Sequence, residues 1–190
     1  MFTGDIEYYC MVLYNILEPL EYYIGTERRT KQFSDFKCKK KGGSVLYGYT
    51  WKGYLKKDDN GNNVLRKKSK YKGLYETKIK EQHPELEDIF KQFIKLHYPS
   101  FKWTQVQINK NYLSPPHFDS KNIGESIIIG LGDYTGGFLN IDRNDYIETV
   151  NIKDYAYKFN GSKFKHWVTP IKSGERISVV FFNNCSLNLI

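Results

Sequence analysis

Two side chains that commonly bind metal ions stand two residues apart in Ser114–Ser126, which reads SPPHFDSKNIGES. They are His117 and Asp119. Residues i and i+2 of a β-strand point to the same face, so both side chains could contact one ion if this stretch is extended. Such pairs also occur by chance in polar turns. The pair by itself therefore leaves both a metal site and a polar turn open, and a third ligand is required.

The chain has four histidines, and one of them can supply that third ligand. His83 and His97 flank a predicted helix, where structural roles are expected. His166 instead opens the predicted strand HWVTPI, after the turn FNGSKFK, and a closed antiparallel barrel would bring it close to His117. Two histidines and one carboxylate on one face leave three positions of an octahedral ion open. This is the facial triad of non-haem Fe(II) oxygenases.

The stretch after His166, HWVTPIKSGERISVVFF, predicts a strand, a Pro/Gly turn and a second strand that begins at Arg176. We expect Arg176 and Ser178 to share a face on a strand paired with that of His166. Arginine offers a planar fork for a carboxylate, and the serine hydroxyl adds a donor. The distal carboxylate of 2-oxoglutarate would neutralise a buried arginine there. The alternative is that Arg176 pairs with Glu175 or another surface acid and that Ser178 has no role.

Several other polar residues could line the same chamber. Gln107, Asn109 and Asn111 alternate on one strand face just before the His-x-Asp pair, where an apolar face is expected for a core. Asn109 and Asn111 are candidates to hydrogen-bond the cosubstrate, and Tyr112 and Asn122 to contact cosubstrate or substrate. Each of these side chains could equally cap a turn or satisfy backbone groups.

The elements that must position these residues are mainly strands. Residues 83–98, HPELEDIFKQFIKLHY, carry apolar residues at helical spacing with acids in the first turns and predict a helix. Residues 7–24 are apolar but ambiguous between helix and strand. Further strands are expected at 44–51, 63–68, 102–112, 125–132, 136–141, 147–152, 155–160, 166–171 and 176–182. The fold class predicted is α+β, mainly β: a double-stranded β-helix (jelly-roll, cupin-like) core with flanking helices.

The chain contains neither a repeat nor a convincing linker, so we expect a single domain. Residues 1–36 would support the core, residues 37–80 would form a basic, aromatic insertion, residues 81–100 would hold the helix, and residues 101–190 would form the catalytic jelly roll.

The positive charge is concentrated in one segment. Residues 37–80 carry 14 basic and 3 acidic side chains, an excess of +11 against +8 for the whole chain, and tyrosines and Trp51 are interleaved with them. Basic and aromatic side chains together suit the phosphates and unstacked bases of DNA or RNA. The alternative is a solvated lysine-rich hairpin with DDNGNN as its turn. The candidate substrate contacts in this segment are Trp51, Arg66, Lys67, Lys68 and Lys70.

Three features bear on the cellular compartment. No apolar run reaches the length that spans a membrane, and the first residues carry acids where a signal peptide has basic residues. The three cysteines form no Cys-x-x-Cys pair. We therefore expect an intracellular, reducing compartment, cytoplasm or nucleus, and no membrane partner.

From about Trp103 to Asn183 the sequence resembles the 2-oxoglutarate/Fe(II)-dependent dioxygenases of the double-stranded β-helix fold. The resemblance rests on HFD at 117–119, His166, the Arg-x-Ser at 176–178, and GDYTGGFLNI, which is similar to the Gly-Gly turn of the family before an inner strand. Within this superfamily the sequence is most similar to the ten-eleven-translocation and base-J-type nucleobase hydroxylases.

The resemblance implies a reaction and a role for each matched residue. His117, Asp119 and His166 would bind Fe(II), while Arg176, helped by Ser178, would anchor 2-oxoglutarate. O2 would be the second cosubstrate, with ascorbate as an auxiliary reductant. Oxidative decarboxylation of 2-oxoglutarate would yield succinate and an oxidant that abstracts a substrate hydrogen.

Three classes of function remain open at this point. The first is oxidation of a nucleobase in DNA or RNA, for example a 5-methylpyrimidine, with a duplex target flipped out of the stack. The second is hydroxylation of a protein side chain or a small metabolite. Prolyl hydroxylases of this fold usually anchor the cosubstrate with lysine, so Arg176 argues against that branch. The third, a non-enzymatic binding module, is disfavoured by the complete set of metal and cosubstrate residues.

Overall fold

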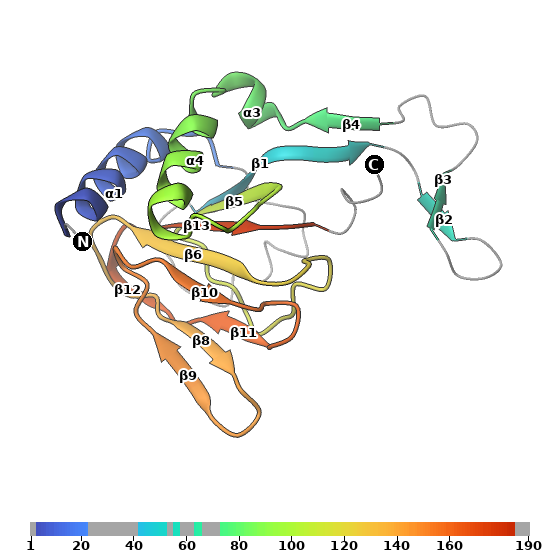
Figure 1. The fold of residues 1–190 in the computed structure, drawn as a ribbon. Coiled ribbons are helices and arrows are strands. Elements are labelled where there is room, and N and C mark those ends of the chain that lie inside the picture. The colour runs from blue at the N-terminus through green and yellow to red at the C-terminus, as the bar shows by residue number, and fades with distance from the viewer. Residues whose placement is uncertain (1–2, 23–41, 53–54, 58–62, 66–72, 185–190) are drawn as a thin grey trace.

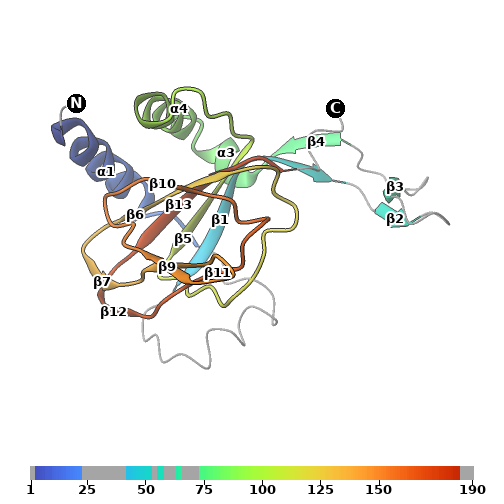
Figure 2. The ribbon, with the colours of Figure 1, turned by 60° about the horizontal axis from the view of Figure 1, so that its bottom comes forward.

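Two antiparallel β-layers face each other, and helices cover the outer face of the larger one (Figures 1 and 2). The structure, a computed structural model, describes residues 3–22, 42–52, 55–57, 63–65 and 73–184. The described helices are α1 (Thr3–Leu17), α3 (Lys78–Gln82) and α4 (Leu86–His97). The described strands are β1 (Gly43–Lys52), β2 (Leu55–Lys57), β3 (Asn63–Leu65), β4 (Gly73–Glu76), β5 (Gln105–Lys110), β6 (Ser126–Leu131), β7 (Tyr134–Gly136), β8 (Leu139–Asp142), β9 (Ile147–Val150), β10 (Tyr157–Phe159), β11 (His166–Val168), β12 (Ile171–Gly174) and β13 (Ile177–Phe182).

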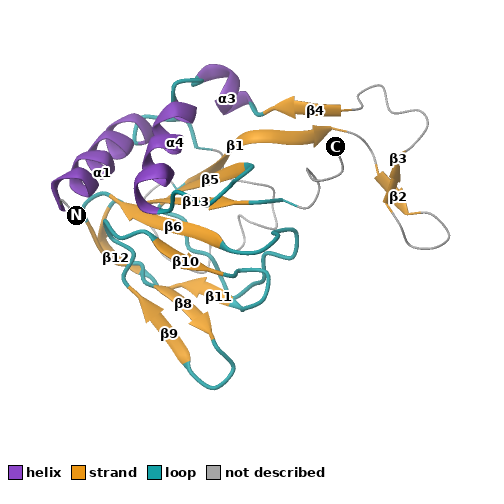
Figure 3. Ribbon diagram, viewed as in Figure 1, coloured by secondary structure: helices purple, strands orange, loops and turns teal. Residues whose placement is uncertain are grey.

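The larger layer is a six-stranded sheet in the order β10-β6-β13-β5-β1-β4. Facing it are the three-stranded sheet β11-β8-β9 and the two-stranded sheet β12-β7 (Figure 3). Every strand pair within these sheets is antiparallel. Few helices and two facing antiparallel layers are the architecture of a jelly roll, which confirms the fold class predicted from the sequence.

Strand alternation divides the six-stranded sheet into a core face and a chamber face. In β13, Ile177, Val179 and Phe181 are fully buried under the helices, whereas Ser178 and Val180 line a chamber between the two layers. The neighbouring strands β5 and β1 follow the same rule, because successive side chains of a strand point to opposite faces. One strand therefore builds both the hydrophobic core and the candidate site.

Helix α4 holds the outer face of the sheet in place. The spacing of its apolar residues puts Phe90 and Phe93 on one side, and both are fully buried. The ring of Phe90 contacts those of Tyr47 and Phe181 edge-on, at centroid distances of 5.2 and 5.5 Å. The ambiguous N-terminal segment is helical as far as Leu17, and it adds Leu13 to this core. None of the described helices is both long and apolar enough to cross a membrane.

Part of the basic segment belongs to the core sheet. Strand β1 lies between β5 and β4, and its residue Tyr47 is fully buried. The backbone of Trp51 pairs with that of Leu74, and β2 pairs antiparallel with β3. The structure describes the backbone of Trp51 but not its side chain. The other predicted substrate contacts in this segment, Arg66, Lys67, Lys68 and Lys70, lie outside the described residues.

One expectation about strand pairing is wrong. Strand β13, which follows Arg176, does not pair with β11, which carries His166; β13 lies between β5 and β6, and β11 pairs with β8. The intervening residues Ile171–Gly174 form a strand of their own, β12, which pairs with β7. Gly174, with φ of 80°, then turns the chain toward the other layer. His166 and Arg176 therefore approach the chamber from opposite walls.

Candidate active site

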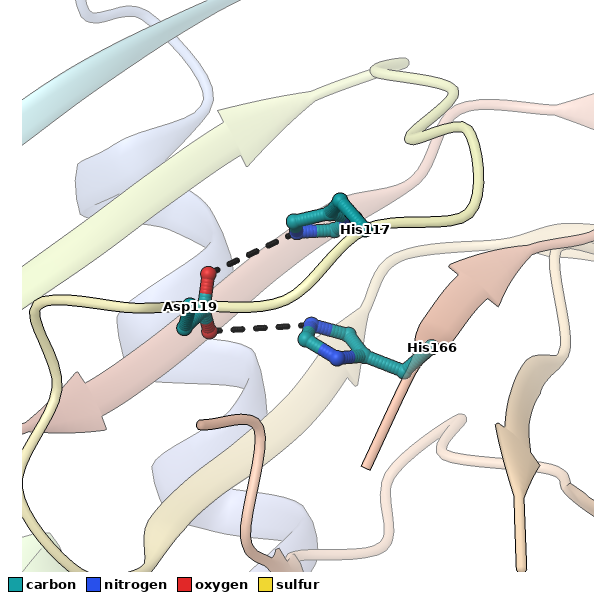
Figure 4. A group of neighbouring side chains, drawn as sticks. All are labelled: His117, Asp119 and His166. Atoms are coloured by element: carbon teal, nitrogen blue, oxygen red, sulfur yellow. Dashed lines mark ion pairs between the residues drawn. The ribbon is translucent and has the colours of Figure 1, made fainter. Parts of the chain in front are cut away.

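His117, Asp119 and His166 all line the chamber, and their ligand atoms lie within 4.8 Å of one another (Figure 4). The Nε2 atom of His117 lies 3.5 Å from Oδ1 of Asp119, and Nε2 of His166 lies 3.6 Å from Oδ2. The backbone brings these side chains together: His117 and His166 exchange two N–H···O=C bonds of 3.0 Å, and the N–H of Asp119 donates to Gly161. Main-chain hydrogen bonds therefore hold the three residues next to one another.

Both imidazole rings present Nε2 to the shared space. The Nδ1 atom of His117 lies 2.8 Å from the carbonyl oxygen of Pro115, and Nδ1 of His166 lies 3.1 Å from that of Phe164. A carbonyl oxygen can only accept, so Nδ1 of each ring carries a proton, and in the neutral form of each ring Nε2 has its lone pair free for a metal ion. Two imidazole nitrogens and a carboxylate on one side are the donor set that Fe(II) takes in a facial triad.

The electrostatics of the three groups favour a charged carboxylate between histidines. Burial opposes ionisation of Asp119, but the hydrogen bond from His117 and the charges of both histidines outweigh it and lower the pKa of the carboxyl. Burial lowers the pKa of His166, and the charge of His117 lowers it further. Burial also disfavours the charged form of His117, but its hydrogen bonds to Asp119 and Pro115 raise its pKa overall.

Gly161 supports the triad in a way that the sequence did not reveal. A Cβ added at Gly161 would lie 2.8 Å from Oδ2 of Asp119 and 3.0 Å from Cε1 of His166. Glycine is therefore the residue that leaves room for both ligands. The only available signal was its position in the Asn-Gly turn before His166, and that reads equally well as ordinary turn chemistry.

We expect Gly161→Ala to weaken metal binding by about 10- to 100-fold, because the methyl group displaces two ligands from their places. Titration of the protein with Co(II), followed by its visible absorption, measures the affinity directly. Ser162→Ala is the matched control, since it removes only the hydroxyl bond to Asn160 in the same turn. An unchanged affinity in Gly161→Ala would show that the ligands do not need this space.

Among the residues that the structure describes, Arg176 is the largest fully buried side chain, with 1% of its surface exposed. None of its three guanidinium nitrogens has a hydrogen-bond partner among the described residues, and the ring centroid of Tyr134 lies 5.8 Å from its Cζ. Burial lowers the pKa of Arg176, yet a guanidinium stays charged at neutral pH. A buried charge without a partner costs several kcal/mol, so this site fits an anion. The alternative pairing with Glu175 does not occur as a salt bridge among the described residues.

Asn111 positions Arg176. Its N–H donates to the carbonyl of Arg176 at 2.8 Å, and its Oδ1 accepts from the N–H of Arg176 at 2.9 Å. Asn111 adopts a φ of 48°, in the left-handed region that asparagine tolerates, so its side chain leaves the alternating pattern of β5. It is therefore absent from the described chamber wall, and its backbone N–H and Oδ1 hold the backbone of Arg176.

A chamber of about 350 Å³ joins the triad to Arg176. The remaining predicted cosubstrate residues line it: Ser178 and Asn109, which share a 3.4 Å hydrogen bond. The tentative substrate residues Tyr112 and Asn122 line it as well, and the amide of Asn122 donates to Oδ2 of Asp119 at 3.2 Å. The sequence did not point to Ser44 or to the apolar wall, whose members read as ordinary core: Ile128, Leu139, Phe159, Val168, Val180 and Phe182.

No protein-family model and no curated protein matches this chain, but solved structures with a similar fold do. Among solved structures, NgTET1 in complex with 5mC DNA is 18% identical, with 83% of this chain and 67% of that chain covered and a TM-score of 0.48. A 2OG-Fe(II) oxygenase family oxidoreductase from Burkholderia pseudomallei is 13% identical (95% and 91% covered, TM-score 0.43). A Pseudomonas putida prolyl-4-hydroxylase is 15% identical (57% and 63% covered, TM-score 0.38).

The fold and the site define a jelly roll with a two-histidine, one-carboxylate centre and a buried arginine. The solved structures found include the kinds of protein that the sequence resemblance names, a TET protein and a 2OG-Fe(II) oxygenase.

Proposed function

We propose that this protein is an Fe(II)- and 2-oxoglutarate-dependent oxygenase that oxidises a nucleobase in DNA or RNA. The observation that carries the oxygenase part is the unpartnered guanidinium of Arg176 in the same chamber as the triad. A metal site alone fits many reactions. A metal site that shares its chamber with a buried cation fits a cosubstrate that brings both a metal chelator and a distal carboxylate.

The residues of the chamber divide the work. His117, Asp119 and His166 would hold Fe(II), which when bound supplies the oxidising chemistry with 2-oxoglutarate and O2. Arg176 binds the distal carboxylate through its fork of N–H donors, and the hydroxyl of Ser178 adds a donor. Apolar side chains from both layers form the rest of the wall around these groups.

The nucleobase part of the proposal rests on the basic, aromatic segment 37–80. Its excess of +11 suits a polyanion, and the chamber itself has a single Arg or Lys in its described lining, Arg176. A phosphate backbone would therefore be held outside the chamber while one base enters it. Hydroxylation of a protein side chain or a small metabolite is the second candidate, and it needs no polyanion site.

Mass spectrometry of nucleosides tests this proposal. Methylated and unmodified DNA and RNA are incubated with the protein, Fe(II), ascorbate and 2-oxoglutarate, and the released nucleosides are compared with those of a reaction without 2-oxoglutarate. We expect a 2-oxoglutarate-dependent oxidised nucleoside. Replacing Arg66, Lys67, Lys68 and Lys70 together with serine should reduce product and weaken binding, with a shallower dependence of affinity on salt.

Two outcomes separate the candidates. If succinate forms without any nucleoside product and the protein does not bind DNA or RNA at low salt, the substrate is instead a protein side chain or a small metabolite. If the variant with all four basic residues replaced forms the nucleoside product at the wild-type rate, the nucleobase remains the proposed substrate and these basic residues have no role in its binding.

A further inference from the structure

The chamber reaches solvent beside two of the three triad residues. The side chain of His117 is 37% exposed and that of Asp119 is 28% exposed, whereas His166 and Arg176 are buried. All four side chains line the same chamber. A molecule can therefore approach the triad from the side of His117 and Asp119, while Arg176 lies in the buried part of the wall.

Phe118 lies between these two exposed ligands, and its side chain points the other way. Successive side chains of an extended chain lie on opposite faces, so the ring of Phe118 is directed away from the chamber. Phe118 is not part of the described chamber lining, and 47% of its surface is exposed. Consecutive Cα atoms are about 3.8 Å apart, so this ring is attached one residue away from each ligand. An aromatic surface therefore faces solvent directly beside the exposed part of the triad.

A lysine lies opposite this ring. The backbone bridge between His117 and His166 is antiparallel, so the residue after His117 lies opposite the residue before His166. These two residues are Phe118 and Lys165, and the Nζ atom of Lys165 is 5.9 Å from the centroid of the Phe118 ring. Lys165 is exposed, so its ammonium group is open to solvent on the same side as the ring.

A second lysine, Lys163, is exposed in the turn before His166, with its Nζ atom 5.2 Å from the ring centroid of Phe164. Neither Lys163 nor Lys165 forms a salt bridge with an acidic side chain among the described residues. Five other lysines in the described part of the chain do so: Lys80, Lys91, Lys110, Lys153 and Lys158. Two positive charges next to the triad are therefore available to an anion from outside the protein.

We propose that Phe118, Lys163 and Lys165 form a binding platform at the mouth of the chamber for the nucleotides next to the target base. The ring of Phe118 stacks on an unpaired neighbouring base, and the two ammonium groups bind phosphates of the same strand. This inference rests on the proposed nucleobase function and names the part of the strand that the described residues hold. The partner is an unpaired segment of DNA or RNA, because the bases of an intact duplex already stack on one another.

The platform and the chamber would act on different parts of one strand. The described chamber lining has one basic side chain, Arg176, and this residue is buried and assigned to the cosubstrate. Phosphates are therefore better accommodated outside the chamber than within it. The neighbouring nucleotide is bound beside His117 and Asp119, and the target base can then reach the triad from their exposed side.

Binding of short fluorescent single strands of DNA and RNA tests the platform. Fluorescence anisotropy is measured with 2-oxoglutarate and a redox-inert divalent metal at several salt concentrations. We expect Phe118→Ala to weaken binding at least about five-fold, because a stacked base is lost, and Phe118→Trp to restore it. Replacing Lys163 and Lys165 together with glutamine should reduce the slope of log affinity against log salt by about 1.4, or ~0.7 for each phosphate contact.

Two variants on the far side of the large sheet are matched controls. Tyr8→Ala removes an exposed aromatic ring from α1, and Lys91→Gln removes the charge of a lysine on α4 that is paired with Glu87. Both helices cover the outer face of the six-stranded sheet (Figures 1 and 2), so both variants should bind the strands with wild-type affinity. Iron content and melting temperature show whether each platform variant keeps its ligands in place and is folded.

Labelled polyglutamate separates a nucleic-acid platform from a general attraction to anions. It carries negative charge without bases, so it should bind more weakly than the nucleic-acid strands, and Phe118→Ala should not change its affinity. Equal binding of polyglutamate and the strands by the wild type would overturn the stacking role of the ring.

The remaining outcomes distinguish this inference from the proposed function. If Phe118→Ala and the double lysine variant bind and oxidise the strands as the wild type does, the platform is overturned and the nucleobase function stands. If these variants lose binding as expected but the wild type yields no oxidised nucleoside, the platform stands and the nucleobase function fails. If the wild type binds neither strand at low salt, the platform is overturned, and succinate formation separately decides whether the protein is an oxygenase.

Discussion

Replacing His166 with alanine is expected to reduce Fe(II) affinity and 2-oxoglutarate turnover by at least about 100-fold, since it removes one of three protein ligands. The backbone that brings the triad together should survive, because the reciprocal bonds between residues 117 and 166 are made by main-chain atoms. Iron content after anaerobic reconstitution and succinate formation measure the two losses separately. His117→Ala and Asp119→Ala should behave alike.

His83→Ala is the matched control for this series. His83 lies outside the chamber and contacts Glu85, so its removal should change neither iron content nor turnover. Full iron binding by His166→Ala at the wild-type affinity would disprove the triad. Loss of iron in His83→Ala as well would indicate that histidine replacement perturbs the protein generally.

The sequence was sufficient to predict most of the core and the three residues that meet at the candidate metal site. Short runs of mostly apolar residues in 125–132 and 176–182 predicted the central strands, and both strands are buried along almost their whole length. His117 and Asp119 could be recognised as a pair because residues two apart on an extended chain point to the same side. His166 could be added since it was the one histidine at the start of a predicted strand.

The long-range pairing could not be predicted, and two errors follow from that. The expectation that the strands of His166 and Arg176 pair assumed the shortest connection, whereas β12 pairs with β7 and separates them. The alternation rule placed Asn111 on the chamber wall, but its left-handed backbone turns it toward Arg176. Neither a sheet partner nor a single left-handed residue leaves a clear periodic signal in the sequence.

Arg176→Met is expected to produce two effects of opposite sign. The concentration of 2-oxoglutarate needed for half-maximal turnover should rise on the order of 100-fold or more, because the fork of charged donors is lost. The cosubstrate-free protein should instead become more stable, by about 1–3 kcal/mol, because an unpartnered buried charge is replaced by an apolar chain of similar length. Replacing a binding-site residue is seldom expected to stabilise a protein, so this effect would distinguish Arg176.

Thermal unfolding measures both effects in one experiment. In the wild type, 2-oxoglutarate with a redox-inert divalent metal should raise the melting temperature, and in Arg176→Met the same addition should change it little. Without ligands, the variant should melt several degrees higher, since ~1 kcal/mol corresponds to about 2–4 °C in a chain of this size. Arg143→Met is the control, because this guanidinium already donates to Glu148 and lies 4.5 Å from the ring of Phe164.

The control should show the reverse pattern. Arg143→Met breaks a paired contact, so it should lower or leave unchanged the melting temperature while the response to 2-oxoglutarate stays intact. A wild-type response to 2-oxoglutarate in Arg176→Met would reject the anchoring role. A large fall in its ligand-free melting temperature would show that the guanidinium has a partner within the protein and that its charge is already compensated, and then an anionic cosubstrate would no longer be needed to explain the buried arginine.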